Sequence, residues 1–349
     1  MRVLAIDVGA GTTDVLLWDS GCGGENQTHL IVPSGTKVVA AQIGRATALR
    51  LPVIFEGPLM GGGSNASAMK RHVAQGLAFY ATPTAGGSFN DDLAAVAAMG
   101  VSLVEPQEVS SLATAGAVRV RSGDIRFPEL LEALRLVGES APLDGCALAV
   151  QDHGRAEPGE SARPFRFEKV AATLARSHRL SGFFHRRDDV PEYFTRMRAA
   201  ADLIDAAIPL VVGDTGPSAL WGASLAASKM PCLAINFGNS HTMMAFVDGE
   251  SVDGVFEHHT SMLDAARMES YVRRFAAADL ENAEVFAGGG HGTIKTSRPV
   301  DLAQVEILVT GPRRREFASV GLALTEASLH GDMMLTGCYG LLQGYLATR

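Results

Sequence analysis

The chain has 349 residues, of which 47% are hydrophobic and 19% are charged. This length predicts two domains or three, and the composition excludes a chain that is disordered as a whole. The 30 Lys and Arg residues against 38 Asp and Glu give a net charge of −8, which argues against a partner role for nucleic acid, because such proteins neutralise phosphates with an excess of basic residues.

The cysteines are few and far apart. Cys22, Cys146, Cys232 and Cys338 form no CxxC pair and no CxxxCxxC run, which argues against a zinc ribbon, a thioredoxin-like motif and a radical-SAM activase. We therefore expect free thiols in a reducing compartment. Because the sequence shows neither a secretory leader nor an apolar run of about 18–20 residues, we expect a cytoplasmic protein with no membrane contact.

The first predicted element is a β-hairpin, and it has a second copy. Residues 4–19 read LAIDVGAGTTDVLLWD, and residues 233–248 read LAINFGNSHTMMAFVD. They align without a gap, and Leu, Ala, Ile, Gly, Thr and Asp recur at matching positions. In each copy an apolar strand ends in Asp7 or Asn236, a turn with glycine follows, and a second apolar strand leads out. Internal similarity of this kind predicts two related halves.

The turns of these hairpins have the chemistry of a phosphate-binding loop. Glycine lets the main chain approach a phosphate closely, and the hydroxyls of Thr12, Thr13 and Ser240 can donate further hydrogen bonds. An aspartate at the end of a strand, such as Asp7, can hold hydrated Mg²⁺. Two such hairpins that face one another would clamp the phosphates of a nucleotide between two domains. A structural repeat without a ligand is the alternative.

Further strands and a helix are predicted after the first hairpin. Residues 27–32 read as a third strand beside it, and residues 53–63, VIFEGPLMGGG, as a strand that runs into a glycine turn. Residues 64–76 predict a helix with Ser64 or Asn65 as its N-cap. An open helix N-terminus can bind an anion, but an ordinary strand–turn–helix unit is favoured.

Two later strands end in polar residues. The segment CALAVQDHG (146–154) ends with Asp152 and His153, and IPLVVGDTGPSALWGA (208–223) contains Asp214 after its strand. Ligands of open α/β sheets bind beyond the carboxyl ends of strands, so each residue is a candidate general base or ligand of a metal-bound water. The alternatives are a turn acid for Asp152 and an Asx turn or helix cap for Asp214.

Basic residues gather in two other places. The segment 154–198 is rich in Arg, Glu, Pro and Asp, and predicts an insertion with helices that is mobile or faces the substrate. Its Arg186 and Arg187 could grip an anionic small-molecule substrate, whereas a solvated charged face is the more common explanation of such a run. The arginines at 313–315, which follow the strand predicted at 306–311, pose the same choice.

The histidines and the C-terminal segment carry weaker signals. The ten histidines form no HExxH or comparable metal motif. His258 and His259 are adjacent and would point to opposite sides of a strand, so we interpret them as structural or surface residues. Residues 317–347 are predicted to be mostly helical. The small residues that would let this segment pack closely against a sheet are Gly337, Gly340 and Gly344.

These motifs resemble those of a known superfamily. The two hairpins are similar to the phosphate-1 and phosphate-2 motifs of the ATPases that include actin, heat-shock chaperones and sugar kinases (ASKHA), and IDVGAGTTD (6–14) matches the first closely. VFAGGGHG (285–292), after a helical stretch around 262–278, resembles the superfamily's adenosine motif, an apolar strand that ends in a glycine cluster. The whole chain also resembles a family labelled pyruvate formate-lyase activating enzyme, whose cluster cysteines it lacks.

The resemblance implies an α/β fold with two actin-like (ribonuclease H-like) domains, whose mixed sheets are flanked by helices and separated by a cleft. The first domain would span 1–225, with the insertion near 154–198, and the second 226–349. ATP with Mg²⁺ would bind in the cleft, and Asp7 would hold Mg²⁺ through water, while Asp152 or Asp214 would orient the nucleophile. The residues implied for the phosphates are Gly9, Gly11, Thr12, Thr13, Gly238, Asn239 and Ser240, and those for adenosine are Gly288, Gly289 and Gly290.

The second hairpin departs from the superfamily pattern. Asn236 stands where an aspartate is usual, and His241 and Met243 occupy the positions of Thr12 and Asp14. Asparagine keeps an oxygen but removes a charge, which weakens the case for Mg²⁺ binding and hydrolysis. Three functions stay open: an ATPase or small-molecule kinase, which the intact first motif favours, a nucleotide-dependent switch for a protein partner, and a non-catalytic binding module. The acceptor and the oligomeric state stay open as well.

Overall fold

A mixed six-stranded sheet forms the first half of the protein in the computed structural model, which describes residues 1–156 and 161–349. Strand β1 pairs antiparallel with β2, and β2 with β3, whereas β8 and β10 run parallel to β1. From edge to edge the strands are β3 (Thr28–Pro33), β2 (Thr12–Asp19), β1 (Arg2–Val8), β8 (Gly145–Val150), β10 (Leu210–Gly213) and β9 (Phe184–Arg186). The third strand expected beside the hairpin is therefore confirmed.

The second half repeats this pattern. Strand β11 pairs antiparallel with β12, β12 with β13, and β15 runs parallel to β11. From edge to edge the strands are β14 (Gly290–Ile294), β13 (Ser251–His259), β12 (His241–Asp248), β11 (Cys232–Phe237), β15 (Glu306–Thr310) and β16 (Leu324–Glu326). The two sheets share a five-stranded core of the same order and direction, β3-β2-β1-β8-β10 in the first and β13-β12-β11-β15-β16 in the second, and differ in the edge to which the sixth strand, β9 or β14, is added. These mixed sheets, each flanked by helices, confirm the predicted actin-like α/β fold.

The register of the two hairpins confirms the alignment of their sequences. Asp7 lies opposite Asp14 in the first hairpin, and Asn236 lies opposite Met243 in the second. Each turn is closed by one main-chain hydrogen bond. The N–H of Gly9 donates to the carbonyl of Thr12 at 2.9 Å, and the N–H of Gly238 donates to that of His241 at 3.0 Å. The duplicated sequence therefore corresponds to a duplicated backbone.

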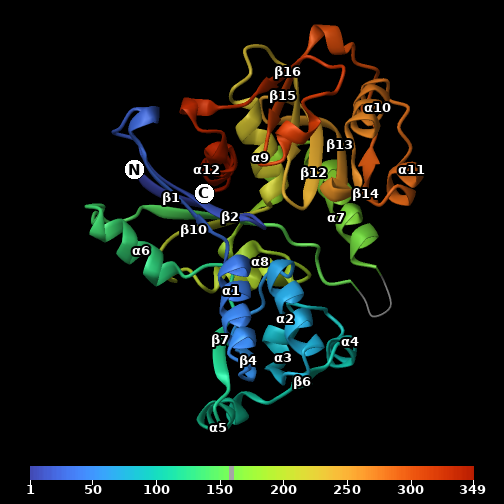
Figure 1. Cartoon of the computed structure of the whole chain (residues 1–349). Coiled ribbons are helices and arrows are strands. Elements are labelled where there is room, and N and C mark those ends of the chain that lie inside the picture. Colours follow the sequence, from blue (N-terminus) through green and yellow to red (C-terminus); the bar gives the residue numbers. More distant parts are fainter. Residues whose placement is uncertain (157–160) are drawn as a thin grey trace.

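A third, smaller sheet was not predicted. It is parallel, with the strand order β6 (Val101–Leu103), β5 (Phe79–Ala81), β4 (Val53–Glu56) and β7 (Val118–Arg121). It has its own apolar core, which includes Phe55 and Phe79, and Figure 1 shows it at the opposite end of the molecule from the second sheet. The expected strand and helix in 53–76 belong to it. Its other strands have only three or four residues, which is too short for a clear period in the sequence.

Helices cover both faces of the two large sheets (Figure 1). Helices α6 and α8 pack on the outer face of the first sheet, and α10 packs on the outer face of the second. The helices are α1 (Gly35–Ala48), α2 (Ser64–Ala74), α3 (Pro83–Gly86), α4 (Leu93–Ala98), α5 (Val109–Thr114), α6 (Phe127–Leu136), α7 (Ala162–Ser177), α8 (Thr195–Ala201), α9 (Thr215–Ser224), α10 (Ala265–Ala276), α11 (Asn282–Ala287) and α12 (Thr336–Thr348).

Two helices each pack on the sheet of the other half. Helix α9 follows β10 of the first sheet but packs on β11 and β12 of the second, whereas α12 follows the second sheet and packs on β1, β2, β8 and β10 of the first. The two helices also pack against each other, and their backbones approach most closely where Gly222 and Gly340 leave room.

Two local expectations were wrong. Residues 317–347 are helical mainly from Thr336 onward, because short 3₁₀ turns and β16 occupy the preceding stretch. The N-cap of α2 is Gly63 and not Ser64 or Asn65, since Asn65 directs its amide to the carbonyl of Gly61. Four residues of the predicted insertion at 154–198, 157–160, lie outside the described residues. The others form α7, α8 and the edge strand β9.

Candidate functional site

A cavity with a volume of about 510 Å³ lies where the loops of the three sheets meet. The turns after β1 and β11 form one wall, and the ends of β8 and β15 form another. Two loops of the small unit, 59–63 and 87–91, close the opposite side, and the start of α12 contributes Gly337. This volume is typical of a site for a small molecule or nucleotide.

The two hairpin turns face one another at this cavity. A Cβ atom on Gly11 would lie 2.5 Å from the amide nitrogen of Asn239, so the first turn directly contacts the second. Of the residues implied for phosphate binding, the cavity is lined by Gly9, Thr12, Gly238, Asn239 and Ser240. Gly11 and Thr13 are not part of its lining, and Thr13 is buried in the sheet. The geometry therefore brings most of the predicted set together.

Asp7 and Asp14 form a pair of carboxylates at the floor of the cavity. They are cross-strand neighbours, and in each the Oδ1 atom is buried without a hydrogen-bond partner. Burial, together with Asp14 and Asp214, raises the pKa of Asp7 well above its usual range. Burial also raises the pKa of Asp14 to about 7, although the Thr12 hydroxyl opposes the shift. A cation beside these oxygens would stabilise both carboxylates.

The raised pKa of Asp14 predicts a pH-dependent stability. Since the unfolded chain releases this proton near pH 4, the free energy of unfolding of the metal-free protein falls as the pH rises from about 4 to about 7. One such group contributes a slope of about 1.4 kcal/mol per pH unit. Asp14→Asn keeps the size of the side chain and removes its titration. We expect it to reduce this decline and to stabilise the protein near pH 8 more than near pH 4.

Urea unfolding in the presence of EDTA, at several pH values between 4 and 8, measures this effect. A pH profile unchanged by Asp14→Asn would show that the carboxyl group of Asp14 ionises as freely in the fold as in water.

Asp152 and Asp214 are both engaged in the structure. Asp152 is buried and lines the cavity, and its two oxygens accept hydrogen bonds from the N–H groups of Gly154 at 2.8 Å and Met197 at 2.9 Å. Asp214 caps α9 by accepting the N–H of Gly216 at 3.0 Å, and it lies behind the cavity wall. The helix cap is the alternative that the sequence had offered for Asp214.

An arginine that the sequence did not single out joins these elements. Arg166 of α7 is buried, donates to Asp214 at 2.7 Å and to Glu257 of β13 at 2.9 Å, and also bonds the carbonyl of Asp152. Burial alone would raise the pKa of Glu257, but Arg166 overrides it and lowers that pKa. The ion pairs therefore connect the first half, through α9, with the second half, through β13.

Other predicted contacts lie elsewhere. Residues 285–287 belong to α11, and Gly290 begins β14, so VFAGGGHG is a helix followed by a strand and not an apolar strand that ends in glycines. Gly288, Gly289 and Gly290 do not line the cavity, whereas Gly311, which follows β15, does. Arg186 and Arg187 donate to main-chain carbonyls and do not line the cavity, so neither contacts a ligand that is bound there.

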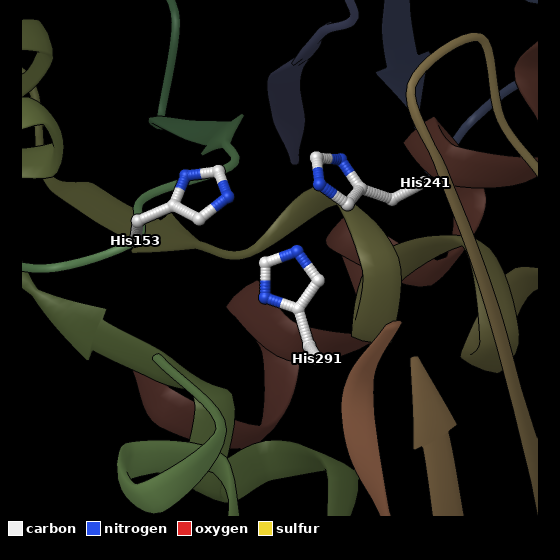
Figure 2. A group of neighbouring side chains, drawn as sticks. All are labelled: His153, His241 and His291. Carbon is white, nitrogen blue, oxygen red and sulfur yellow. The ribbon is translucent and has the colours of Figure 1, made fainter. Parts of the chain in front are cut away.

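A cluster of histidines borders the cavity next to the second turn. His153 follows β8, His241 begins β12 and His291 lies in β14, and Figure 2 shows their rings turned toward a common space. The ring centroids are 4.9–5.3 Å apart. Both ring nitrogens of His241 and of His291 are buried without a partner. His259 lies beside these two, with centroids at 4.7 and 4.9 Å, so its assignment as a structural or surface residue missed this position.

These imidazoles are neutral at neutral pH. Burial, followed by the charge of Arg166 and the neighbouring rings, lowers the pKa of His153 well below its usual range, and burial with His291 does the same for His241. Burial lowers the pKa of His291 to about 4. No sequence motif could have indicated the cluster, because its members come from the loop after β8 and from two separate strands, and only the fold brings them together.

The duplicated sheets and the facing turns define an actin-like α/β fold with a candidate ligand site between its two halves. A family model described as "Putative pyruvate format-lyase activating enzyme (DUF1786)" matches residues 60–316, which is more than half of the chain. The chain therefore belongs to this family. Among the described residues no three cysteines gather, and Cys146, Cys232 and Cys338 are buried.

No curated protein matches the chain in sequence. Solved structures with similarity include the inorganic polyphosphate/ATP-glucomannokinase from Arthrobacter sp. strain KM, with 11% identity, a TM-score of 0.37 and 99% coverage of both chains. A PilM–PilN type IV pilus biogenesis complex has 10% identity, a TM-score of 0.39 and coverage of 99% and 98%. The ethanolamine utilization protein EutJ from Carboxydothermus hydrogenoformans has 11% identity and a TM-score of 0.34, and the match covers 98% of this chain and 89% of EutJ. None of the described helices is both long and apolar enough to cross a membrane.

Proposed function

We propose that this protein binds ATP with Mg²⁺ in the central cavity and transfers its terminal phosphoryl group to water or to a small molecule. The observation that carries this proposal is the pair of equivalent turns, 9–12 and 238–241, that meet at the cavity. Main-chain N–H groups and small hydroxyls in such turns suit phosphate oxygens. In this assignment Gly9, Thr12, Gly238, Asn239 and Ser240 bind the phosphates.

The charge of the cavity supports a role for Mg²⁺. Its lining contains five acidic residues, Asp7, Asp14, Asp91, Asp152 and Glu257, and a single arginine, Arg196. The guanidinium of Arg196 is already paired with Asp124 at 2.8 Å. Glu257 is likewise paired with Arg166, so a divalent cation that entered with a triphosphate would meet the carboxyl groups of Asp7 and Asp14 and would favour their charged form. The unpartnered oxygens of Asp7 and Asp14 suit a hydrated Mg²⁺, which prefers carboxylate, water and phosphate ligands.

We assign the nucleoside end of the ligand to the wall formed by Gly311 and Pro312. Gly311 has a φ of +94°, and an added Cβ would lie 2.6 Å from the side-chain oxygen of Asn236. Only glycine keeps the backbone open at this position. The residues 288–290 that the sequence suggested for adenosine lie outside the cavity lining. The loops 59–63 and 87–91 of the small unit would then face the acceptor.

A nucleotide-dependent switch is the second candidate, and one observation favours it. Both oxygens of Asp152 are held by main-chain N–H groups, and Asp214 is held by Arg166 and by its own helix. A carboxylate with these partners is a weaker general base than one that faces the acceptor. If turnover is slow, the protein stays in its nucleotide-bound form, and a protein partner would recognise the closed cleft of that form.

Thermal unfolding with ATP, ADP and a non-hydrolysable ATP analogue, each with and without Mg²⁺, tests the proposal. We expect a Mg²⁺-dependent stabilisation, which for a ligand at 100 times its Kd is about 2.7 kcal/mol. Phosphate release, measured alone and with candidate acceptors, then separates the enzyme from the switch. If no nucleotide stabilises the protein, neither candidate holds.

A further inference from the structure

We propose that His153, His241 and His291 bind one divalent transition-metal ion, for which Zn²⁺ is the reference. One ring nitrogen of each residue lies within 4.8 Å of those of the other two. Zinc–nitrogen distances are about 2.0–2.1 Å, so small rotations of the three side chains bring all of them onto one ion. Figure 2 shows the rings around the space that this ion would occupy.

The lack of hydrogen bonds at these rings points to a ligand. His291 is only 1% exposed, and neither of its ring nitrogens has a partner in the described part of the chain. The same holds for both nitrogens of His241. A buried polar group without a partner costs about 1–3 kcal/mol, and two neighbouring imidazoles in this state are difficult to explain as packing. A metal ion supplies the missing partner, since neutral imidazole is a preferred ligand of Zn²⁺.

The site is open on one side. His153 and His241 line the central cavity, whereas His291 lies behind them in β14. Three histidine ligands with an open position are typical of zinc sites that bind water or substrate, and four protein ligands are typical of purely structural zinc sites. We therefore infer that the fourth ligand is a water or a substrate oxygen in the cavity, next to the turn that contains Ser240.

This site differs from the one proposed for Mg²⁺ and does not depend on it. Imidazole nitrogens select transition metals, whereas the carboxylates of Asp7 and Asp14 select hard cations such as Mg²⁺. The ligands also come from both halves of the protein, since His153 follows β8 of the first sheet and the other two lie in the second sheet. A bound ion would therefore connect the two halves directly.

The experiment uses the full-length protein without nucleotide, so that its result is independent of the proposed ATPase. After removal of metal, Zn²⁺ is titrated in competition with a chromophoric chelator, and Co²⁺ is titrated with detection of its visible absorption. We expect one ion per chain and the intense Co²⁺ bands of a four-coordinate site. Mutation of residues that only support the metal ligands weakens metal binding by about 10–100-fold. Because His153→Ala and His241→Asn each remove a ligand, we expect each to weaken Zn²⁺ binding by more than this.

His29→Ala is the matched control, because His29 is exposed on the edge strand β3 of the first sheet and is not part of the cluster. It should leave both titrations unchanged, and circular dichroism should show that every variant is folded. Two results would overturn the proposal: Zn²⁺ binding that is weak or not stoichiometric in the wild type, or binding of equal strength in folded His153→Ala and His241→Asn. If Zn²⁺ binds and no nucleotide does, the metal site stands and the proposed function fails.

Discussion

Replacing Asp7 with asparagine is expected to remove the Mg²⁺-dependent stabilisation by ATP, a loss of about 2.7 kcal/mol at a ligand concentration 100 times the wild-type Kd. The side chain keeps its size and loses the charge that would hold the cation. Because Asp7 is a buried carboxylate with a raised pKa and an unpartnered oxygen, the metal-free variant should be at least as stable as the wild type. Thermal unfolding with and without Mg²⁺ and ATP measures both effects.

Asp202→Asn provides the control, since Asp202 is exposed at the end of α8. It should leave the stabilisation unchanged. The reciprocal change Asn236→Asp restores the charge that the second hairpin lacks, and we expect it to strengthen Mg²⁺ binding. If Mg²⁺ and ATP stabilise Asp7→Asn as much as the wild type, the cation does not bind at the first hairpin.

Gly340→Ala is expected to destabilise the fold by more than the 1–3 kcal/mol typical of overpacking. The added Cβ would lie well under 3.0 Å from the carbonyl oxygen of Ser218 and close to the N–H of Gly222, both on the backbone of α9. Main-chain atoms cannot move aside as a flexible side chain can, so α9 and α12 would have to separate. Because each helix covers the sheet of the other half, this separation would disturb both sheets.

Gly44→Ala is the matched control for this variant. Gly44 lies within α1, and an added Cβ would meet nothing within 4 Å. Alanine is the better helix former by about 0.8–1.0 kcal/mol, so this change should stabilise the protein. Urea unfolding of the two variants compares the same chemical change at a crowded and at an open site. Similar stabilities would mean that α9 and α12 are not in close contact.

Much of the fold was predicted from the sequence because local patterns of apolar residues and glycines indicate its strands and turns. The apolar strands and glycine turns of residues 4–19 and 233–248 recur without a gap, and the paired strands have equivalent register. Repetition of this kind survives in the sequence because each copy forms the same hairpin. It predicted the two halves, and it led to most of the turn residues that line the cavity.

The small sheet and the adenosine motif show where local patterns fail. Strands of three or four residues, such as β5 and β6, carry too little periodicity to be recognised. The glycines at 288–290 resemble a nucleotide-binding turn, but they end α11 and start β14. Glycine indicates a backbone with special freedom, and it does not indicate what lies beside that backbone.

The sequence by itself determined that this protein has two related halves, each with a hairpin whose turn contains glycine, because strand periodicity and turn chemistry are properties of neighbouring residues. Only the tertiary structure decided which side chains meet across those halves. It places Arg166 between Asp214 and Glu257, and it gathers His153, His241 and His291 from three separate segments of the chain. Such contacts join residues about 50 to 140 positions apart along the chain, and they depend on how sheets and helices pack, which no local pattern records.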